Sequence, residues 1–268
     1  MVFFPEVAII IPTNFTRNDY LIKTLNSLSP LGIGQVIIVT SKNFDLNTAF
    51  QFLDLITNKD FQLRIAVIRQ DGSGIANAIN FGFKNVNENI RYISWLGDDD
   101  YITSSSLIEG VAFLKTNENY VGTFGYCNYI SSNDEFLWQN NFGKKSFWLS
   151  KIGPNLVPQP GAMFRLSALQ KLNFLSEKYN NSFDHDLYLR LMAIGRLKFF
   201  HKHFGTFRWH IDSVSVKNRS NLCKESAKVR IANKKNLVTK FLQLLLEPLN
   251  FTLVYFAPYF VIRDKKNS

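Results

Sequence analysis

Short apolar runs alternate with amphipathic segments over the first hundred residues of the chain. The predicted strands cover residues 7–11, 35–39, 64–68 and 92–96. The predicted helices between them cover about residues 18–28, 46–56 and 74–84. Short runs rich in Ile and Val suit strands that are buried on both faces, as in parallel sheets. The alternation therefore predicts an α/β fold with a mostly parallel central sheet flanked by helices.

The pattern becomes mixed after residue 120. A strand is predicted at residues 121–129, a short helix at 167–172 and a helix at 184–193. The polar and aromatic stretch that ends at Lys151 has no clear period, so its structure is left open. No internal repeat or low-complexity linker separates this half from the first, and we expect it to be added to the same sheet.

The composition is that of a folded protein with a sizeable core. Of the 268 residues, 46% are hydrophobic and 15% aromatic, which fits one large domain or a domain with a helical appendage. The two cysteines, Cys127 and Cys223, lie far apart and form no Cys-x-x-Cys motif. Neither a disulfide framework nor a thiolate zinc site is predicted, and a reducing, cytoplasmic location fits best.

Two apolar segments near the chain ends do not meet the requirements of targeting or membrane segments. The N-terminus reads MVFFPEVAIIIPTN, in which no basic leader precedes the apolar run between Pro5 and Pro12. This indicates a buried strand rather than a signal peptide. Residues 249–262 are the other segment, which is short and interrupted by Pro258. We therefore expect no conventional transmembrane helix.

The positive charge is concentrated at the C-terminus. The net charge is +10, and residues 217–268 hold 11 Lys and Arg against 3 acidic residues, a balance of +8. With the apolar sequence LVTKFLQLLL, this segment predicts a C-terminal helical extension. Two interpretations stay open: residues 237–268 lie on an anionic membrane surface, or they pack on the domain with a solvated basic face. No nucleic-acid partner is expected, because no recognised motif accompanies the charge.

Polar residues follow several of the predicted strands. The carboxyl ends of parallel strands meet at one edge of a sheet, where ligands collect in such folds. The residues at these ends are Thr13, Ser41, Asp71, Asp98, Asp99 and Asp100. Three adjacent carboxylates repel one another unless solvent, cations or hydrogen-bond donors take up the charge. A solvated turn that caps the next helix is one interpretation, but the common edge favours a ligand crevice.

Five ordered stretches carry a resemblance to a known family. They read IIPTNFTRNDYLIKTLNSL, QDGSGIANAINFG, WLGDDD, SFDHDLYLRLMAIG and FRWHIDSVS. Together they resemble the family-2 inverting glycosyltransferases, which have the A-type nucleotide-diphospho-sugar transferase fold. The resemblance implies a catalytic domain over residues 1–216, with a nucleotide-binding half at 1–100 and an acceptor half at 101–216. Residues 217–268 then form the basic and aromatic helical extension.

The resemblance also implies roles for individual residues. The implied metal ligands are Asp99, Asp100 and His210. The implied nucleotide-binding residues are Pro12, Thr13, Ser41, Asp71, Asn77, Asp98 and Arg208. The implied acceptor-binding residues are Gln159, Gly161 and Asp186. Carboxylate and phosphate oxygens suit hard divalent cations, so the implied cofactor is Mn²⁺ or Mg²⁺.

Asp184 matches the catalytic acid of the family and is the implied general base. A base for this reaction has to lie within hydrogen-bond reach of the acceptor hydroxyl. The alternative is an N-cap of the helix DLYLRLMAIG, since Asp commonly occupies that position. A Pro-Gly turn at residues 159–162 has a similar alternative as an ordinary turn.

The sequence departs from the family pattern at four places. Thr40 and Ser41 replace the paired acids that often read the base, so a uridine preference is not supported. Ile79 replaces an Arg, Gly97 replaces the first Asp of the metal motif, and Phe183 replaces the Glu before Asp184. The donor sugar, the nucleotide, the linkage and the acceptor therefore stay open.

The expected function is that of an inverting, metal-assisted hexosyltransferase. It would move a sugar from a nucleotide-diphosphate sugar to a hydroxyl of a glycan or lipid-linked acceptor, in surface polysaccharide biosynthesis at the inner face of the membrane. A non-catalytic nucleotide- or glycan-binding protein on the same fold is an alternative. A nucleotidyltransferase is disfavoured, because the opening loop IIPTNFTRND lacks the glycines of a phosphate-binding loop.

Overall fold

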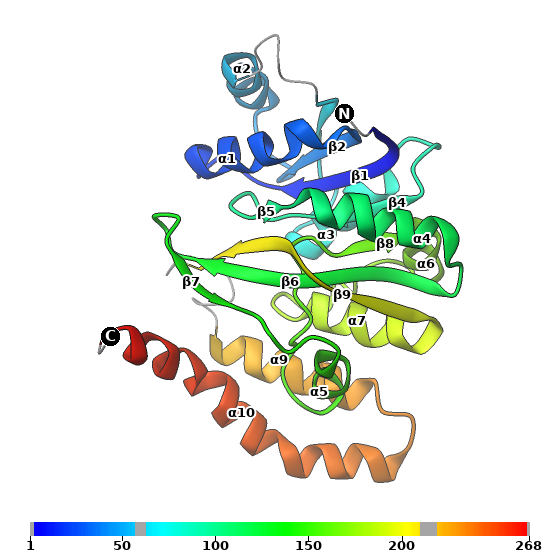
Figure 1. The fold of residues 1–268 in the computed structure, drawn as a ribbon, viewed down its shortest axis with the longest axis vertical. Helices are drawn as coiled ribbons and strands as arrows, with labels where there is room; N and C mark the ends of the chain where they lie inside the picture. Colours follow the sequence, from blue (N-terminus) through cyan, green and yellow to red (C-terminus); the bar gives the residue numbers. More distant parts are fainter. Residues whose placement is uncertain (1–2, 57–62, 210–218, 267–268) are drawn as a thin grey trace.

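The computed structural model describes the backbone of residues 3–56, 63–209 and 219–266 (Figure 1). The first half alternates strands and helices as predicted. Its strands are β1 (Phe4–Pro12), β2 (Ile33–Thr40), β3 (Ile65–Arg69) and β4 (Tyr92–Trp95). Its helices are α1 (Asn18–Leu28), α2 (Leu46–Ile56) and α3 (Ile75–Lys84), with a 3₁₀ turn η1 (Ser29–Leu31) after α1. The bounds of α1 and α2 agree with the predicted helices at residues 18–28 and 46–56.

The second half adds strands and helices to the same sheet. Its strands are β5 (Tyr101–Ile102), β6 (Tyr120–Ile130), β7 (Phe136–Gln139), β8 (Met163–Arg165) and β9 (Arg196–Arg208). Its helices are η2 (Ser106–Val111), α4 (Ala112–Thr116), α5 (Lys145–Ile152), α6 (Leu166–Lys171), α7 (Phe183–Ile194), α9 (Arg219–Ala232) and α10 (Leu237–Lys266). The stretch whose structure was left open thus holds β7 and α5.

The described strands form a single sheet. Its order is β3-β2-β1-β4-β8-β6-β9-β5, and β7 pairs with β6. The pairs among β1 to β4 are parallel, as is the long β6–β9 pair, while β8, β7 and β5 join in antiparallel orientation. The predicted α/β class, with a mostly parallel sheet flanked by helices and a C-terminal helical extension, is confirmed.

The parallel register brings the strand ends to one edge. Ile10 of β1 lies opposite Trp95 of β4, and Pro12 lies opposite Val39 of β2. The backbone N–H of Thr13 then donates to the Val39 carbonyl at 3.0 Å. The loops that follow β1, β2 and β4 therefore begin side by side, which is the placement expected for a ligand crevice.

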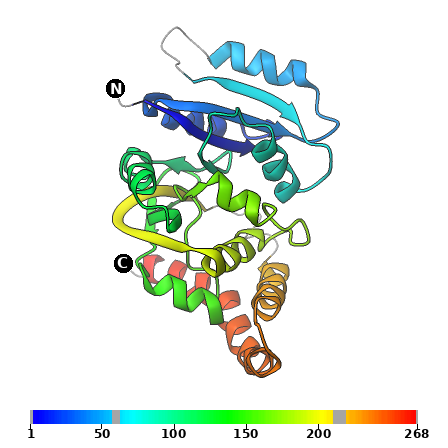
Figure 2. The same cartoon turned by 90° about the vertical axis from the view of Figure 1, so that its right-hand side faces the viewer.

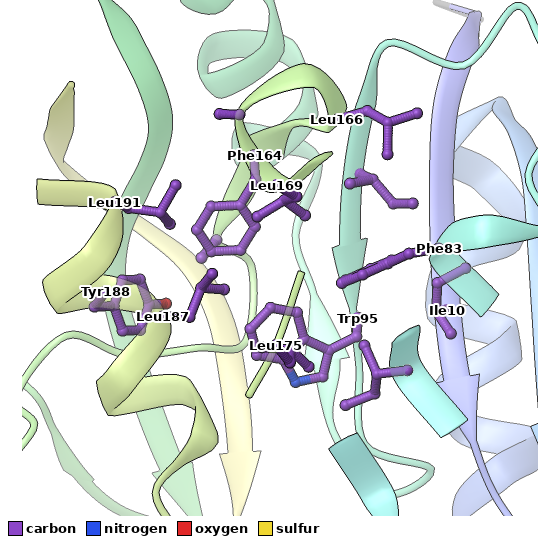
Figure 3. Close-up of a cluster of buried hydrophobic side chains, with 14 of the residues drawn as sticks. Ile10, Phe83, Trp95, Phe164, Leu166, Leu169, Leu175, Leu187, Tyr188 and Leu191 are labelled. Carbon is purple, nitrogen blue, oxygen red and sulfur yellow. The ribbon is translucent and has the colours of Figure 1, made fainter. Parts of the chain in front are cut away.

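Both faces of the sheet are buried. Successive strand residues point to opposite faces, so one strand contributes side chains to two clusters. Ala8 and Ile10 of β1 belong to one hydrophobic cluster, while Val7, Ile9 and Ile11 belong to the other. Figure 3 shows the first cluster, in which Trp95, Phe164 and Tyr188 bring together β4, β8 and α7. The acidic turn after β4 and the N-terminal turn of α7 are thus held to one core.

A glycine lets α3 approach the sheet closely. A Cβ at Gly82 would lie 2.4 Å from Cγ2 of Ile10 and 3.1 Å from Cγ2 of Val39. No side chain fits that space without a shift of β1 or α3. The glycine at the end of the motif QDGSGIANAINFG is therefore explained by packing.

Helices α9 and α10 form the end of the molecule opposite α2 (Figures 1 and 2). The predicted boundary between residues 216 and 217 falls within residues 210–218, outside the described residues. None of the helices in the described ranges is both long and apolar enough to cross a membrane.

Candidate active site

A cavity of about 600 Å³ opens at the carboxyl ends of the strands. One side is formed by the end of β1 and by the acidic turn, residues 97–100, after β4. The opposite side is formed by β7, the loop 154–160 and the first turn of α7. Helix α9 also contributes, through Arg219, Leu222 and Ser226. The sheet and the C-terminal extension therefore build this cavity together.

Hydrogen bonds and ion pairs hold the carboxylates of the acidic turn. The Thr13 hydroxyl donates to Oδ2 of Asp98 at 2.5 Å. The guanidinium of Arg17 pairs with Asp98 and, through Nη1 at 2.6 Å, with Oδ2 of Asp99. Arg17, Asp98 and Asp99 all line the cavity. A cation of the protein itself thus neutralises part of the acidic charge.

Asp100 is tied to the end of β9. Its carboxylate accepts the backbone N–H of Arg208 at 2.9 Å, and its carbonyl accepts the Thr24 hydroxyl at 3.0 Å. Burial, together with the neighbouring charge of Asp99, raises the pKa of Asp100 well above its usual value. Burial also raises the pKa of Asp98, against the opposing effect of Arg17. The ionised forms of Asp98 and Asp100 are therefore less favoured here than in a solvated carboxyl.

Gly97 has a steric reason to be glycine. A Cβ at this position would lie 2.8 Å from both Oδ1 of Asp99 and Oδ2 of Asp100. An Asp here would crowd these carboxylates and add a fourth negative charge. The departure from the family motif at Gly97 is therefore coupled to the positions of Asp99 and Asp100.

Asp184 lies in the first turn of α7 and lines the same cavity as Asp99. Its Oδ2 accepts Nδ2 of Asn155 at 2.9 Å, and its Oδ1 accepts the backbone N–H of His185 at 2.7 Å. Burial raises the pKa of Asp184 to about 6, although these two hydrogen bonds favour the charged form. A carboxyl with this pKa can accept a proton near neutral pH.

The alternative role of Asp184 as a helix N-cap is wrong, because Ser182 is the N-cap residue of α7. Glu225 of α9 satisfies the donors at this helix start instead. Its Oε2 accepts the backbone N–H groups of Asn181 at 2.6 Å and Ser182 at 3.1 Å. The Asp184 carboxylate accepts the N–H of His185 within the first turn, but Asp184 does not occupy the N-cap position.

Aromatic side chains form the part of the cavity wall that β6, β7 and the end of β9 provide. Trp138 stacks on Tyr129 with ring centroids 4.6 Å apart and meets Trp209 edge-on at 6.0 Å. Phe207 also packs against Tyr129, with ring centroids 5.4 Å apart, and Phe142 lines the cavity as well. The cavity thus has a charged side, near the acidic turn, and an apolar aromatic side.

Two of the predicted site residues make internal structural contacts and are not among the residues that line the cavity. Arg208 is fully buried, and its side chain donates to carbonyls of Asp99 and Ser131. Asp186 is buried and accepts Nε of Arg190 at 2.6 Å. These contacts differ from the predicted nucleotide role of Arg208 and acceptor role of Asp186, because each side chain is taken up by an internal network.

Gly161 belongs to a tight turn against β9. The N–H of Ala162 donates to the Gln159 carbonyl at 2.9 Å, and Gly161 has φ 82°. With Pro160 before it, Gly161 occupies the position where such turns require glycine. The turn interpretation of this segment is therefore correct for Gly161, while Gln159 lines the cavity and donates to the Trp95 carbonyl at 2.5 Å.

Of the remaining predicted nucleotide residues, Pro12 lines the cavity, whereas Ser41, Asp71 and Asn77 are not among its lining residues. Ser41 donates its backbone N–H to the side chain of Asn14 at 2.9 Å. Asp71 is exposed. Asn77 accepts the Gly72 N–H at 3.1 Å and donates to Glu177 at 3.1 Å, so it shapes the loop before α3. His210, a predicted metal ligand, lies outside the described residues.

The acidic turn fits a hard divalent cation that also binds phosphate. Within the described ranges, no three His, Cys, Asp or Glu side chains are grouped so that they could hold a metal by themselves. Mg²⁺ usually binds through one or two carboxylates and completes its coordination with substrate phosphates and water. Asp99 and Asp98 provide such oxygen donors at the cavity wall.

Several site residues were not singled out from the sequence. Arg17 lies within the first matched stretch, and its position shortly after a strand end was the available signal. Asn155, Trp138 and Glu225 reach the site from segments without a motif. No pattern in the sequence indicated them, because their role depends on contacts between distant segments.

The sheet, the acidic turn after β4 and the carboxylate on α7 define a protein of the A-type nucleotide-diphospho-sugar transferase fold. The model of the family described as "Glycosyl transferase family 2" matches residues 8–172, more than half of the chain. The chain therefore belongs to glycosyl transferase family 2, a family of glycosyltransferases, and the predicted family membership is confirmed.

Individual relatives agree with this assignment. Chondroitin synthase from Pasteurella multocida is 25% identical over 156 residues, which cover 58% of this chain and 16% of that protein. The chain thus spans about a sixth of the length of this relative. Among solved structures, residues 1–349 of S. aureus TarS in complex with UDP-GlcNAc match with a TM-score of 0.62 at 17% identity, over 94% of this chain and 73% of that one. Mannosyltransferase PcManGT from Pyrobaculum calidifontis, in complex with GDP-Man and Mn²⁺, matches with a TM-score of 0.62 at 11% identity, over 100% and 78%. At these identities the structural likeness shows the fold alone.

Proposed function

We propose that the protein is an inverting hexosyltransferase that moves a sugar from a nucleotide-diphosphate sugar to an acceptor hydroxyl. The observation that carries the proposal is the convergence of two acidic sites, far apart in sequence, on one cavity. Asp99 lies on the sheet side and Asp184 on the α7 side of this cavity. Transfer requires a base on one side of the reacting carbon and a means of stabilising the departing diphosphate on the other.

Asp184 is the general base in this proposal. The acceptor O–H proton moves to its carboxylate, and the acceptor oxygen forms a bond to the anomeric carbon. The bond from that carbon to the diphosphate oxygen breaks, and the nucleoside diphosphate leaves with the electron pair. Attack opposite the leaving group inverts the configuration. The pKa of about 6 supports the role, because the carboxyl is mostly ionised at pH 7 and still basic enough to accept a proton.

The acidic turn and Arg17 bind the diphosphate end of the donor. Arg17 pairs with Asp98 and Asp99 at the cavity wall, so its guanidinium lies where a diphosphate would approach. Arg binds phosphate oxygens through two parallel hydrogen bonds. A bound Mn²⁺ or Mg²⁺ at Asp99, with Asp98 and Asp100 beside it, would supply charge stabilisation for the leaving group.

A glycan or lipid-linked glycan is the acceptor that the aromatic wall favours. Trp138, Trp209 and Phe142 present apolar ring surface to the cavity, and such surfaces accommodate the apolar faces of sugar rings. The likeness to a chondroitin synthase supports a polysaccharide product. We place the reaction in surface polysaccharide biosynthesis, at the cytoplasmic face of a membrane.

The donor is a nucleotide-diphosphate hexose. The two structures of similar fold hold UDP-GlcNAc and GDP-Man, which supports this class without choosing between the nucleotides. The Thr40 hydroxyl is fully buried and directed to backbone carbonyls, so Thr40 offers no replacement for a base-reading acid. Ser41 and Asp71 remain our proposed contacts at the nucleotide rim.

The division of the chain also remains a proposal. Residues 1–216 would be the catalytic domain, with its nucleotide half at 1–100 and acceptor half at 101–216, and residues 217–268 the extension. Arg219 and Leu222 contribute to the cavity wall, which supports a catalytic unit that includes α9.

The experiment is a donor panel with two variants. Purified protein with Mn²⁺ is incubated with several nucleotide sugars, and both thermal shift and slow donor hydrolysis are measured. We expect Asp184→Asn to lower turnover by about a hundredfold while donor binding is kept. Arg17→Ala should weaken donor binding itself. Asp54→Asn, an exposed acid on α2, is the control and should change neither.

Each alternative has its own outcome. Donor binding without turnover by the native chain would indicate a non-catalytic binding protein. Pyrophosphate release from a nucleoside triphosphate and a sugar phosphate would indicate a nucleotidyltransferase. Full turnover by Asp184→Asn would remove Asp184 from the mechanism.

A further inference from the structure

Helix α10 faces the protein with its polar side. Three residues at helical spacing, Gln243, Glu247 and Asn250, form the side that contacts the domain and α9. Gln243 and Asn250 are only 1% and 6% exposed. Both donate to the carbonyl of Ile152 at the end of α5, at 3.0 and 2.7 Å. Amphipathic helices of globular proteins normally bury the apolar side, so α10 has the opposite orientation.

Buried polar contacts hold α10 in this orientation. Glu247 forms a two-point ion pair with Arg230 of α9, whose Nε lies 2.9 Å from Oε1. Arg230 is 2% exposed and also donates to the Gly153 carbonyl at 2.9 Å. Rotation of α10 about its axis would bury its leucines but would leave Arg230 and Glu247 unpaired, which is costly for buried charges.

The apolar side of α10 faces solvent as a consequence. This outer face of α10 consists of Leu237, Val238, Phe241, Leu242, Leu244, Leu245, Leu246, Leu249, Phe251 and Leu253. Each side chain in it is at least 39% exposed, and Leu237 is 82% exposed. A contiguous apolar surface of this kind in a soluble domain marks a site for a protein or membrane partner.

The end of α5 that binds α10 also carries exposed apolar side chains. Ile152, whose carbonyl binds α10, is 48% exposed, and Trp148 one helical turn earlier is 73% exposed. The ammonium group of Lys151 lies 4.9 Å from the centre of the Trp148 ring. Exposed Trp beside Lys is typical of segments at the boundary between lipid headgroups and acyl chains.

The positive charge of the extension favours an anionic partner. Residues 217–268 carry 11 Lys and Arg against 3 acidic residues. A second copy of the chain, docked through the same face, would bring two segments of equal positive charge together. An anionic lipid surface instead offers apolar acyl chains to the leucines and negative headgroups to the lysines.

We propose that the outer face of α10, together with the exposed Ile152 and Trp148 of α5, binds the protein to the surface of an anionic bilayer. The helix lies in the plane of the interface with its apolar side in the acyl boundary. The polar contacts to Arg230 and Ile152 keep the catalytic domain attached above it. This inference rests on α10 and its contacts, and it is independent of the chemistry in the cavity.

The test is flotation of the full chain with lipid vesicles. Vesicles of phosphatidylcholine with about a third phosphatidylglycerol are compared with pure phosphatidylcholine at low and at high salt. We expect binding to the anionic vesicles at low salt and at least tenfold weaker binding to the neutral ones. The triple variant Leu242→Ser, Leu245→Ser, Leu249→Ser should lose binding to anionic vesicles by at least tenfold, because it removes apolar side chains that would enter the acyl boundary.

A matched control lies at the other end of the molecule. Phe50 and Leu55 of α2 are also exposed, at 48% and 87%, so Phe50→Ser with Leu55→Ser should leave vesicle binding unchanged. Thermal unfolding and donor binding in solution check that the triple variant is folded, and neither depends on lipid. Equal flotation of the triple variant and the native chain would overturn the proposal. So would a native dimer that the triple variant converts to a monomer while no form floats, because the occupant would then be a second copy.

Discussion

Asp184 shows how burial turns an ordinary carboxyl into a base. Its position in the first turn of α7, at the wall of a cavity, removes water from the carboxylate and raises its pKa to about 6. The hydrogen bond from Asn155 stabilises the charged form and limits the increase. The ionised carboxylate is the active form in the proposed reaction, so activity depends on the balance between these two effects.

We predict that kcat/KM falls about tenfold per pH unit below about pH 6, because Asp184 then becomes protonated. Asn155→Ala removes one hydrogen bond to the carboxylate, so the acid limb should move to higher pH. Rates measured from pH 4.5 to 9 with the native chain and this variant give both values. An acid limb that stays in place in Asn155→Ala would contradict the assignment.

Stability provides an independent measurement of the same group. The pKa of Asp184 is higher in the folded chain, at about 6, than the usual value of 3.8. Its contribution to the free energy of unfolding is therefore complete below about pH 4 and is lost as the pH rises through 6. Asp184→Asn should remove this dependence, which chemical unfolding at pH 4.5 and pH 7.5 would detect.

At the scale of elements, α9 positions the start of α7. Glu225 accepts the N–H groups of Asn181 and Ser182, and the Ser182 hydroxyl lies 3.1 Å from that of Ser226. The extension thus fixes the helix turn that carries Asp184. A carboxylate at a helix start also interacts favourably with the helix dipole.

We predict that Glu225→Ala lowers kcat by about tenfold and leaves donor KM within twofold, because α7 shifts while the acidic turn does not. Loss of a helix cap of this kind costs roughly 1 kcal/mol in the free energy of unfolding. Glu225→Gln keeps one acceptor oxygen and should recover part of kcat. Steady-state kinetics and urea unfolding separate the two effects. A parallel rise in donor KM would point instead to a general loss of structure.

At the scale of the whole molecule, the extension is integrated with the catalytic part. Helix α9 lines the cavity at one end and binds α10 through Arg230, and α10 in turn binds the end of α5. The cavity and the outer face of α10 are therefore connected through one helix. In the proposed bilayer complex, a lipid-linked acceptor would lie at the same end of the molecule as α9.

We predict that Glu247→Ala destabilises the protein by about 3 kcal/mol, because it leaves Arg230 buried without its carboxylate. The double variant Arg230→Met with Glu247→Leu removes both charges and should cost less than the single change. Urea unfolding measures both, and hydrogen exchange of α10 shows whether this helix detaches first. A cost below about 0.5 kcal/mol for Glu247→Ala would mean that the pair acts like an exposed one.

The sequence by itself determined the order of elements in the first half, the fold class and the location of the acidic crevice. Periods of two and of about 3.6 residues are local properties, so the strands of the first half and helices such as α1 and α2 could be read directly. The carboxyl ends of parallel strands share an edge in any such sheet. Asp98 to Asp100 follow a predicted strand, so their place at the ligand crevice could be predicted without their contacts.

Only the tertiary structure decided which side chains meet. Arg17 pairs with acids more than 80 positions away. The Arg208 side chain donates to carbonyls inside the protein, and Glu225 of α9 accepts the Ser182 N–H at the start of α7. An amphipathic pattern defines two faces of α10 but not which one contacts the protein. That choice depended on the Arg230 guanidinium and on the Ile152 carbonyl, 91 positions from Gln243, because a buried polar group has to be satisfied wherever its partner lies.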